Sequence, residues 1–172
     1  MTELPTDLLD LAKDVLVAAK AGGVSIATAE SCTGGLIAGC LTAIPGSSQA
    51  YEGGAVTYSD ESKVSLLGVP RDAIDENGAV SDVVASAMAE GALAASGADI
   101  AISVTGIAGP DGGTKTKPVG LVYMALAQTG RDALVKRYVF AGTRTDIRRA
   151  AVGAALELLL SALREPLDAQ IE

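Results

Sequence analysis

Ser31 is the candidate nucleophile of this sequence. It lies in residues 29–35, Ala-Glu-Ser-Cys-Thr-Gly-Gly, where an extended run of residues gives way to a helical one. A serine hydroxyl attacks a carbonyl only when a neighbouring base takes its proton, and the chain contains no histidine. We therefore predict that Lys63, in the segment 58–63, is the base. The alternative is that Ser31 only caps a helix.

Lys63 can accept a proton only when its amine is neutral. Burial and a nearby helix N-terminus both lower the pKa of a lysine, and both are expected early in a helix capped by Ser59. Tyr58 could assist by hydrogen bonding. The alternatives are a solvated lysine and a tyrosine that only packs.

The backbone amides of Thr33, Gly34 and Gly35 are candidates for binding an oxyanion, and the amides of the loop that begins at Thr105 are the alternative. They open the helix that follows Ser31, and a helix N-terminus presents N–H groups and positive charge. Donors that are preorganised in this way contribute about 3 to 4 kcal/mol each to transition-state stabilisation.

Cys32 is a rival nucleophile, because Glu30, Lys63 and a cysteine would make an acid, lysine and cysteine set. Adjacent residues of an extended chain point to opposite sides, so Ser31 and Cys32 should not both face one site. The alternative for Cys32, and the one we favour for Cys40, is a small buried hydrophobic residue.

A second candidate site is the glycine-rich loop of residues 105–114, which follows a strand and could admit a ribose or phosphate. Residues 109–116 resemble a P-loop, but Thr114 stands where that motif requires glycine, so we reject nucleotide hydrolysis. Arg144 and Arg148, spaced i and i+4 on the last predicted helix, could clamp a phosphate, or simply form a solvated basic face.

Composition favours one domain spanning residues 1–172. The chain is 49% hydrophobic, and its net charge of -8 repels nucleic acid. The acidic N-terminal segment does not match a signal peptide and no run spans a bilayer, so we predict a cytoplasmic protein with no membrane partner. Two cysteines without histidine indicate neither a disulfide framework nor a metal site. We also predict a homo-oligomer.

The apolar pattern alternates between helices and strands. Helices are predicted over residues 4–21, 34–44, 59–67, 82–96 and 145–163, and strands over 24–29, 50–58, 99–104, 119–127 and 133–140. The last two strands should form an antiparallel hairpin around residues 129–132. The predicted fold class is a three-layer α/β/α sandwich with a mixed, mostly parallel sheet and one antiparallel hairpin strand.

The sequence resembles the C-terminal domain of the competence/damage-inducible protein CinA over essentially its whole length. The motifs that carry the resemblance are residues 29–35, 46–48, 57–58 with Lys63, and 103–113 with 117–120. The resemblance implies nicotinamide-nucleotide amidase activity on nicotinamide mononucleotide, with no cofactor. It implies a Ser31–Lys63 dyad with Tyr58, and a substrate site that we assign to Thr33, Gly34, Gly35, Ser48, Thr105, Gly106, Gly109, Arg144 and Arg148. A non-catalytic nucleotide-binding regulatory module is the alternative.

Overall fold

The fold is built on one five-stranded sheet with the strand order β2-β1-β3-β4-β5. A computed structural model describes residues 4–165. The strands are β1 (Ile26–Glu30), β2 (Tyr51–Val56), β3 (Ile100–Gly106), β4 (Leu121–Gln128) and β5 (Leu134–Val139). Strands β1, β2, β3 and β5 run in one direction, and β4 runs against both of its neighbours. The predicted mixed sheet with a terminal hairpin is confirmed.

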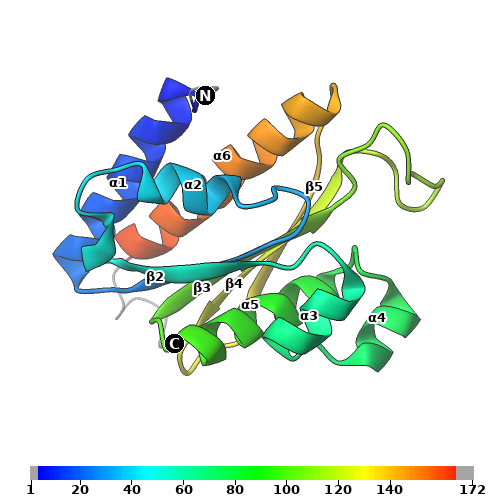
Figure 1. The fold of residues 1–172 in the computed structure, drawn as a ribbon, viewed down its shortest axis with the longest axis horizontal. Helices are drawn as coiled ribbons and strands as arrows, with labels where there is room; N and C mark the ends of the chain where they lie inside the picture. Colours follow the sequence, from blue (N-terminus) through cyan, green and yellow to red (C-terminus); the bar gives the residue numbers. More distant parts are fainter. Residues whose placement is uncertain (1–3, 166–172) are drawn as a thin grey trace.

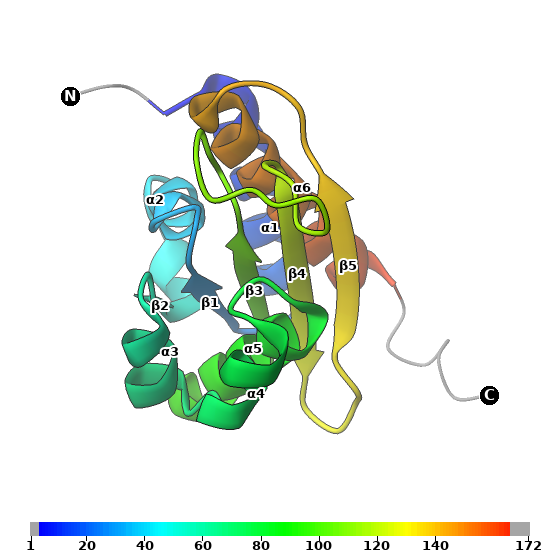
Figure 2. The same ribbon diagram turned by 90° about the vertical axis from the view of Figure 1, so that its right-hand side faces the viewer.

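Helices cover both faces of the sheet, which gives the predicted three layers (Figures 1 and 2). One layer contains α1 (Thr6–Gly22), α2 (Leu36–Thr42) and α6 (Arg144–Arg164). The other contains α3 (Asp60–Leu67), α4 (Arg71–Asn77) and α5 (Asp82–Ser96). A short 3-10 helix, Ser47–Gln49, precedes β2.

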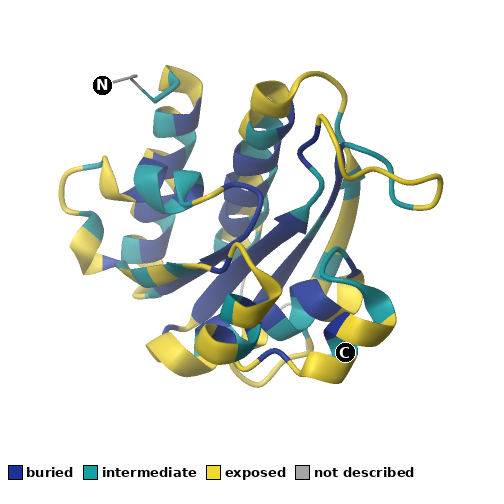
Figure 3. Cartoon of the chain, turned by 45° about the vertical axis from the view of Figure 1, so that its right-hand side comes forward, coloured by how far each residue is buried: buried dark blue, intermediate teal, exposed yellow. Residues whose placement is uncertain are grey.

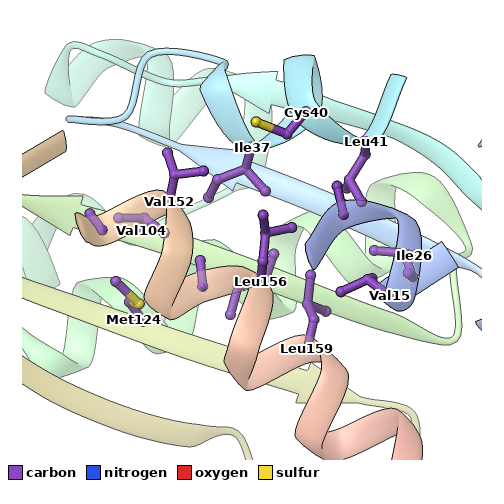
Figure 4. Packing of buried hydrophobic residues seen from close by; sticks show 14 of the residues in the cluster. Val15, Ile26, Ile37, Cys40, Leu41, Val104, Met124, Val152, Leu156 and Leu159 are labelled. Atoms are coloured by element: carbon purple, nitrogen blue, oxygen red, sulfur yellow. The ribbon is translucent and has the colours of Figure 1, made fainter. Parts of the chain in front are cut away.

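Each face of the sheet has its own core. The larger core joins α1, α2 and α6 to β1, β3 and β4 through residues such as Val15, Ile37, Met124 and Leu156 (Figure 4). The smaller core lies under α3 and α5. The strands β1, β3 and β4 are consequently buried along nearly their whole length (Figure 3). Such burial on both faces explains their continuous apolar sequences.

Two predictions about the helices were wrong. No helix was predicted where α4 lies, because Ile74 is its only buried residue and no helical period shows. Helix α2 was predicted over residues 34–44, whereas it spans Leu36–Thr42 with Gly35 as its N-cap, and the Thr33 side chain makes no cap hydrogen bond. Both Gly34 and Gly35 have positive φ values, 62° and 91°, so a turn precedes the helix.

The chain leaves β1 to form β2 on one side and later returns to form β3 on the other. The carboxyl ends of these three parallel strands therefore meet at one edge of the sheet, where open α/β sheets bind ligands. Glu30 is in register with both Val56 and Val104. Within residues 4–165, no helix is both long and apolar enough to cross a bilayer.

Candidate active site

Ser31 and Lys63 meet at the carboxyl edge of β1, as predicted. The Lys63 Nζ lies 3.2 Å from the Ser31 Oγ and donates a hydrogen bond of 2.8 Å to the Thr57 carbonyl oxygen. Lys63 is 1% exposed and Ser31 is 8% exposed. The predicted alternative of a solvated lysine is therefore wrong, and the amine is held between one carbonyl and one hydroxyl.

Burial lowers the pKa of Lys63 from its ordinary value of 10.5, because a charged ammonium loses its hydration there. The negative charge of Asp60 and the proximity of Cys32 act in the opposite direction and are smaller effects. A neutral amine keeps one N–H on the Thr57 carbonyl and turns its lone pair to the Ser31 hydroxyl. This is the arrangement that a general base requires.

Helix α3 delivers Lys63 to this position. It begins at a capping box in which the Ser59 side chain accepts from the Ser62 amide and the Ser62 hydroxyl accepts from the Ser59 amide. Ser59 as the N-cap is a confirmed prediction. Lys63 lies within the first turns of the helix and faces the sheet, where its stem is packed and its amine reaches Ser31.

The loop after β1 keeps only two of its amides free to bind an oxyanion. The Gly34 amide donates to the Ser31 carbonyl at 3.0 Å, and the Gly35 amide donates to Glu30 Oε2 at 3.1 Å. The prediction that these two amides bind an oxyanion is therefore wrong, because both already have acceptors. Among residues 4–165, the amides of Cys32 and Thr33 have no acceptor.

Glu30 explains why the start of α2 is closed to a ligand. Its buried carboxylate accepts hydrogen bonds from the amides of Gly35, Ile37 and Ala38. The chain therefore neutralises its own helix N-terminus with an internal anion. Glu30 has its carboxylate against α2, in the layer opposite to Lys63, so the predicted set of Glu30, Lys63 and Cys32 does not assemble.

The Cys32 side chain lies in the larger core, on the opposite side of the sheet from Lys63 and α3. Burial raises the pKa of its thiol to about 11, so the reactive thiolate is scarce at neutral pH. The prediction that Ser31 and Cys32 face opposite sides is confirmed. Cys40 is fully buried in the same core, as predicted.

Two of the arginines at the start of α6 reach the site. Arg144 donates from Nη2 to the Tyr58 hydroxyl at 2.8 Å and from Nη1 to the Gly109 carbonyl at 2.9 Å. It thereby joins the segment after β2 to the loop after β3. Arg148 contacts the loop after β1 through backbone carbonyls, and Arg149 pairs with Asp7 on α1. Arg144 is exposed and borders the site, whereas Arg149 is exposed but lies against α1.

The other predicted substrate residues fall in different places. Thr105 follows Val104, whose carbonyl accepts from the Ser31 amide, and the Thr105 hydroxyl donates to the Ala79 carbonyl. Gly106 ends β3, where a Cβ atom would lie 2.7 Å from Val122, so close packing against β4 accounts for this glycine. Ser48 is exposed in the 3-10 helix before β2, at the amino end of that strand. The structure does not bring Ser48 together with Ser31.

Thr57 is a site residue that the sequence did not reveal. Its carbonyl anchors the Lys63 amine, and its buried Oγ1 has no hydrogen-bond partner among the described residues. Its signals in the sequence are its place near the end of the strand predicted over residues 50–58 and its membership of the motif of residues 57–58. The described residues contain no group of three His, Cys, Asp or Glu side chains that could hold a metal ion.

The structure is a three-layer α/β/α sandwich in which a buried lysine amine contacts a serine hydroxyl at the carboxyl edge of β1, in a chain without histidine. Residues 8–163 match the family model of the CinA C-terminal domain, and the chain belongs to this family.

Several relatives are similar over most of the chain. The nicotinamide-nucleotide amidohydrolase PncC of Escherichia coli K12 is 46% identical over 154 residues, which are 90% of this chain and 93% of that protein. A CinA-like protein of Geotalea uraniireducens is 52% identical over 149 residues, 87% of this chain but only 35% of that longer protein. The crystal structure of a competence/damage inducible protein from Agrobacterium tumefaciens has a TM-score of 0.90 at 45% identity, covering 95% of this chain and 99% of that chain.

Proposed function

We propose that the protein is a nicotinamide-nucleotide amidohydrolase, which converts nicotinamide mononucleotide and water to nicotinate mononucleotide and ammonia. The contact between Ser31 Oγ and the buried Lys63 Nζ carries the proposal. The name of the E. coli relative, which this chain covers almost completely, supplies the substrate. Amide hydrolysis is the reaction that a serine with an adjacent amine base performs.

The proposed mechanism begins with neutral Lys63 taking the proton of Ser31 as its oxygen attacks the carboxamide carbon. The C–N bond then breaks, and protonated Lys63 gives its proton to the departing nitrogen, which leaves as ammonia. A water molecule attacks the acyl-serine, with Lys63 again accepting a proton. Nicotinate mononucleotide leaves, and Ser31 regains its hydrogen.

Arg144 is the proposed contact for the phosphate of the substrate. Its guanidinium is exposed at the edge of the site, and its hydrogen-bond partners among residues 4–165 are neutral, namely the Tyr58 hydroxyl and the Gly109 carbonyl. A phosphate would offer it stronger, charge-assisted hydrogen bonds. Tyr58 lies between Arg144 and the segment that holds Lys63, and we assign it to substrate positioning rather than to proton transfer.

Two alternative functions, a cysteine amidase and a non-catalytic regulatory module, can be distinguished from the serine amidase by experiment. A cysteine amidase would lose activity when Cys32 is replaced by alanine, whereas we expect Cys32→Ala to retain ammonia release within a few-fold. A regulatory module would bind nicotinamide mononucleotide without releasing ammonia. The high pKa and the core position of the Cys32 thiol favour the serine.

The direct test measures ammonia release from nicotinamide mononucleotide by the wild-type protein and by Ser31→Ala and Lys63→Met. We expect both variants to lose at least about 10³-fold in kcat while keeping native circular dichroism. Ser65→Ala and Lys13→Met change exposed residues of the same types on α3 and α1 and should match wild type. Near-normal turnover by either site variant would refute the Ser–Lys pair.

Cytoplasmic location and a homo-oligomeric state remain predictions, to be checked by cell fractionation and by mass measurement in solution. The expectation of no cofactor is tested by turnover after dialysis against a chelator. The absence of a nucleic-acid partner likewise remains a prediction from the net charge of -8.

A further inference from the structure

Arg148 bonds to the loop that carries the nucleophile, not to a free face of the protein. Its Nε donates to the Cys32 carbonyl at 3.1 Å and its Nη2 donates to the Thr33 carbonyl at 3.0 Å. Two consecutive peptide oxygens directly after Ser31 are therefore held by one rigid, planar fork. A Cβ atom on Gly34 would come within 3.1 Å of Nη2, so this close approach also depends on Gly34.

The direction of these carbonyls fixes the direction of an amide. In a trans peptide the C=O and the N–H of the same unit point opposite ways. Because the Cys32 carbonyl points to Arg148 on α6, the Thr33 N–H points away from α6. Lys63 and the Ser31 hydroxyl meet on the α3 side of the sheet, which is the opposite side. The Thr33 amide is thus aimed out of the layer that contains Arg148.

In the loop of residues 31–35, the amides of Cys32 and Thr33 are the donors that remain available to an oxyanion. The Ser31 amide donates to Val104, the Gly34 amide to Ser31 and the Gly35 amide to Glu30. Within residues 31–35, only the Cys32 and Thr33 amides lack an acceptor. Two adjacent N–H groups next to a nucleophile are the usual form of an oxyanion site.

We propose that Arg148 is a positioning residue, which holds the Cys32–Thr33 and Thr33–Gly34 peptides so that the Thr33 amide, next to the free Cys32 amide, receives the oxyanion formed at Ser31. This inference rests on the proposed amidase function. It also replaces the prediction that Arg148 clamps a phosphate, because two of its guanidinium nitrogens, Nε and Nη2, already donate hydrogen bonds to carbonyls.

The test compares Arg148→Lys and Arg148→Met with the matched control Arg149→Met. A lysine at 148 can reach one carbonyl but not both, so we expect kcat to fall about 10-fold for lysine and about 100-fold for methionine. KM should change less than 3-fold. Arg149 is in the same turn but pairs with Asp7 at the surface, so its variant should keep wild-type kcat.

A second substrate separates positioning from phosphate binding. Nicotinamide riboside lacks the phosphate, and the Arg148 variants should lose the same factor on it as on the mononucleotide. A loss seen only with the phosphorylated substrate, or a rise in KM at constant kcat, would overturn the positioning role. The apparent pKa of the pH–rate profile should stay unchanged in the variants, because Lys63 is untouched.

A readout without the natural substrate keeps the inference testable if the wild-type protein releases no ammonia, which would refute the proposed function alone. Phosphonylation of Ser31 by a fluorophosphonate probe, followed by mass spectrometry, also develops charge on an oxygen beside the nucleophile. We expect it to slow by about 10-fold or more in Arg148→Met, with shifted amide NMR signals at Cys32 and Thr33. Labelling at the wild-type rate, or unshifted amide signals, would contradict the proposal.

Discussion

Lys63 owes its proposed chemistry to its surroundings. A lysine in water is charged at neutral pH and cannot take a proton. Lys63 is 1% exposed, and its hydrogen-bond partners in the described part of the chain are one carbonyl and one hydroxyl. No carboxylate forms an ion pair with it within residues 4–165. Burial without a counterion is the combination that lowers the pKa of an amine most strongly.

The pH dependence of the reaction should report this amine. Because the pKa of Lys63 lies below 10.5, kcat should rise with pH and level off as the amine becomes neutral, with a midpoint below 10.5. The chain has no histidine, so we expect no histidine inflection. Steady-state rates across the pH range test this. A midpoint that moves in Tyr58→Phe would assign the titration to the phenol instead.

Removing the amine should stabilise the fold at neutral pH. The unfolded chain binds more protons than the folded one between the lowered pKa and 10.5, so this group's contribution to stability rises with pH through that window. Lys63→Met should therefore have a higher unfolding free energy than the wild-type protein at pH 7. Urea titrations should show the advantage shrinking at high pH. A gain in the unfolding free energy of Lys63→Met that does not change with pH would show that the packing of methionine, and not the lost amine, is the cause.

At the scale of elements, α3 can place Lys63 only if it lies close to α5. Gly91 on α5 allows this, because a Cβ atom there would lie 2.0 Å from the carbonyl oxygen of Leu67 at the end of α3. The atom in the way belongs to the backbone of α3, so it cannot move aside as the end of a flexible side chain could. The contact therefore links the packing of two helices to the reach of one catalytic amine.

We expect Gly91→Ala to lower both stability, by about 2 kcal/mol, and kcat, by about 10-fold, since α3 must shift. Gly153→Ala on α6 is the matched control. Its added Cβ would meet Leu8 at an ordinary 3.5 Å, so the better helix propensity of alanine should raise stability by about 0.5 to 1 kcal/mol. Thermal unfolding and ammonia release measure both effects. Unchanged kcat in Gly91→Ala would separate the helix contact from catalysis.

The sequence predicted those elements whose boundary signals are local. Ser59 and Ser81 mark the starts of α3 and α5, and both helices begin where their caps predict. The pairing of Ser31 with Lys63 was predicted from residue chemistry. The partners that hold the site could not be predicted, because the Thr57 carbonyl and the Cys32 and Thr33 peptides are backbone groups, which every residue carries. Glu30 as the cap of α2 depends likewise on a turn that no motif announced.

At the scale of the molecule, the site combines parts from distant regions of the chain. Ser31 follows the first strand, Lys63 belongs to a helix after the second, and Arg144 and Arg148 begin the last helix. The sheet brings them together because β1 pairs with both β2 and β3. No single segment could hold this arrangement without the whole sheet.

Heat should therefore abolish activity and structure together. If residues 1–172 form one domain, circular dichroism and residual ammonia release should show a single transition at the same temperature, with equal calorimetric and van't Hoff enthalpies. Activity that is lost well before the secondary structure would show that the α6 end detaches on its own. Two separated heat-capacity peaks would contradict the single domain.

Both cysteine thiols of this chain are buried in the apolar interior, and the chain contains no histidine. The reagents and oxidants that silence many hydrolases act on those two groups. An enzyme built in this way should continue to work after exposure to peroxide or iodoacetamide for as long as it stays folded. Its vulnerability shifts instead to reagents that acylate a hydroxyl.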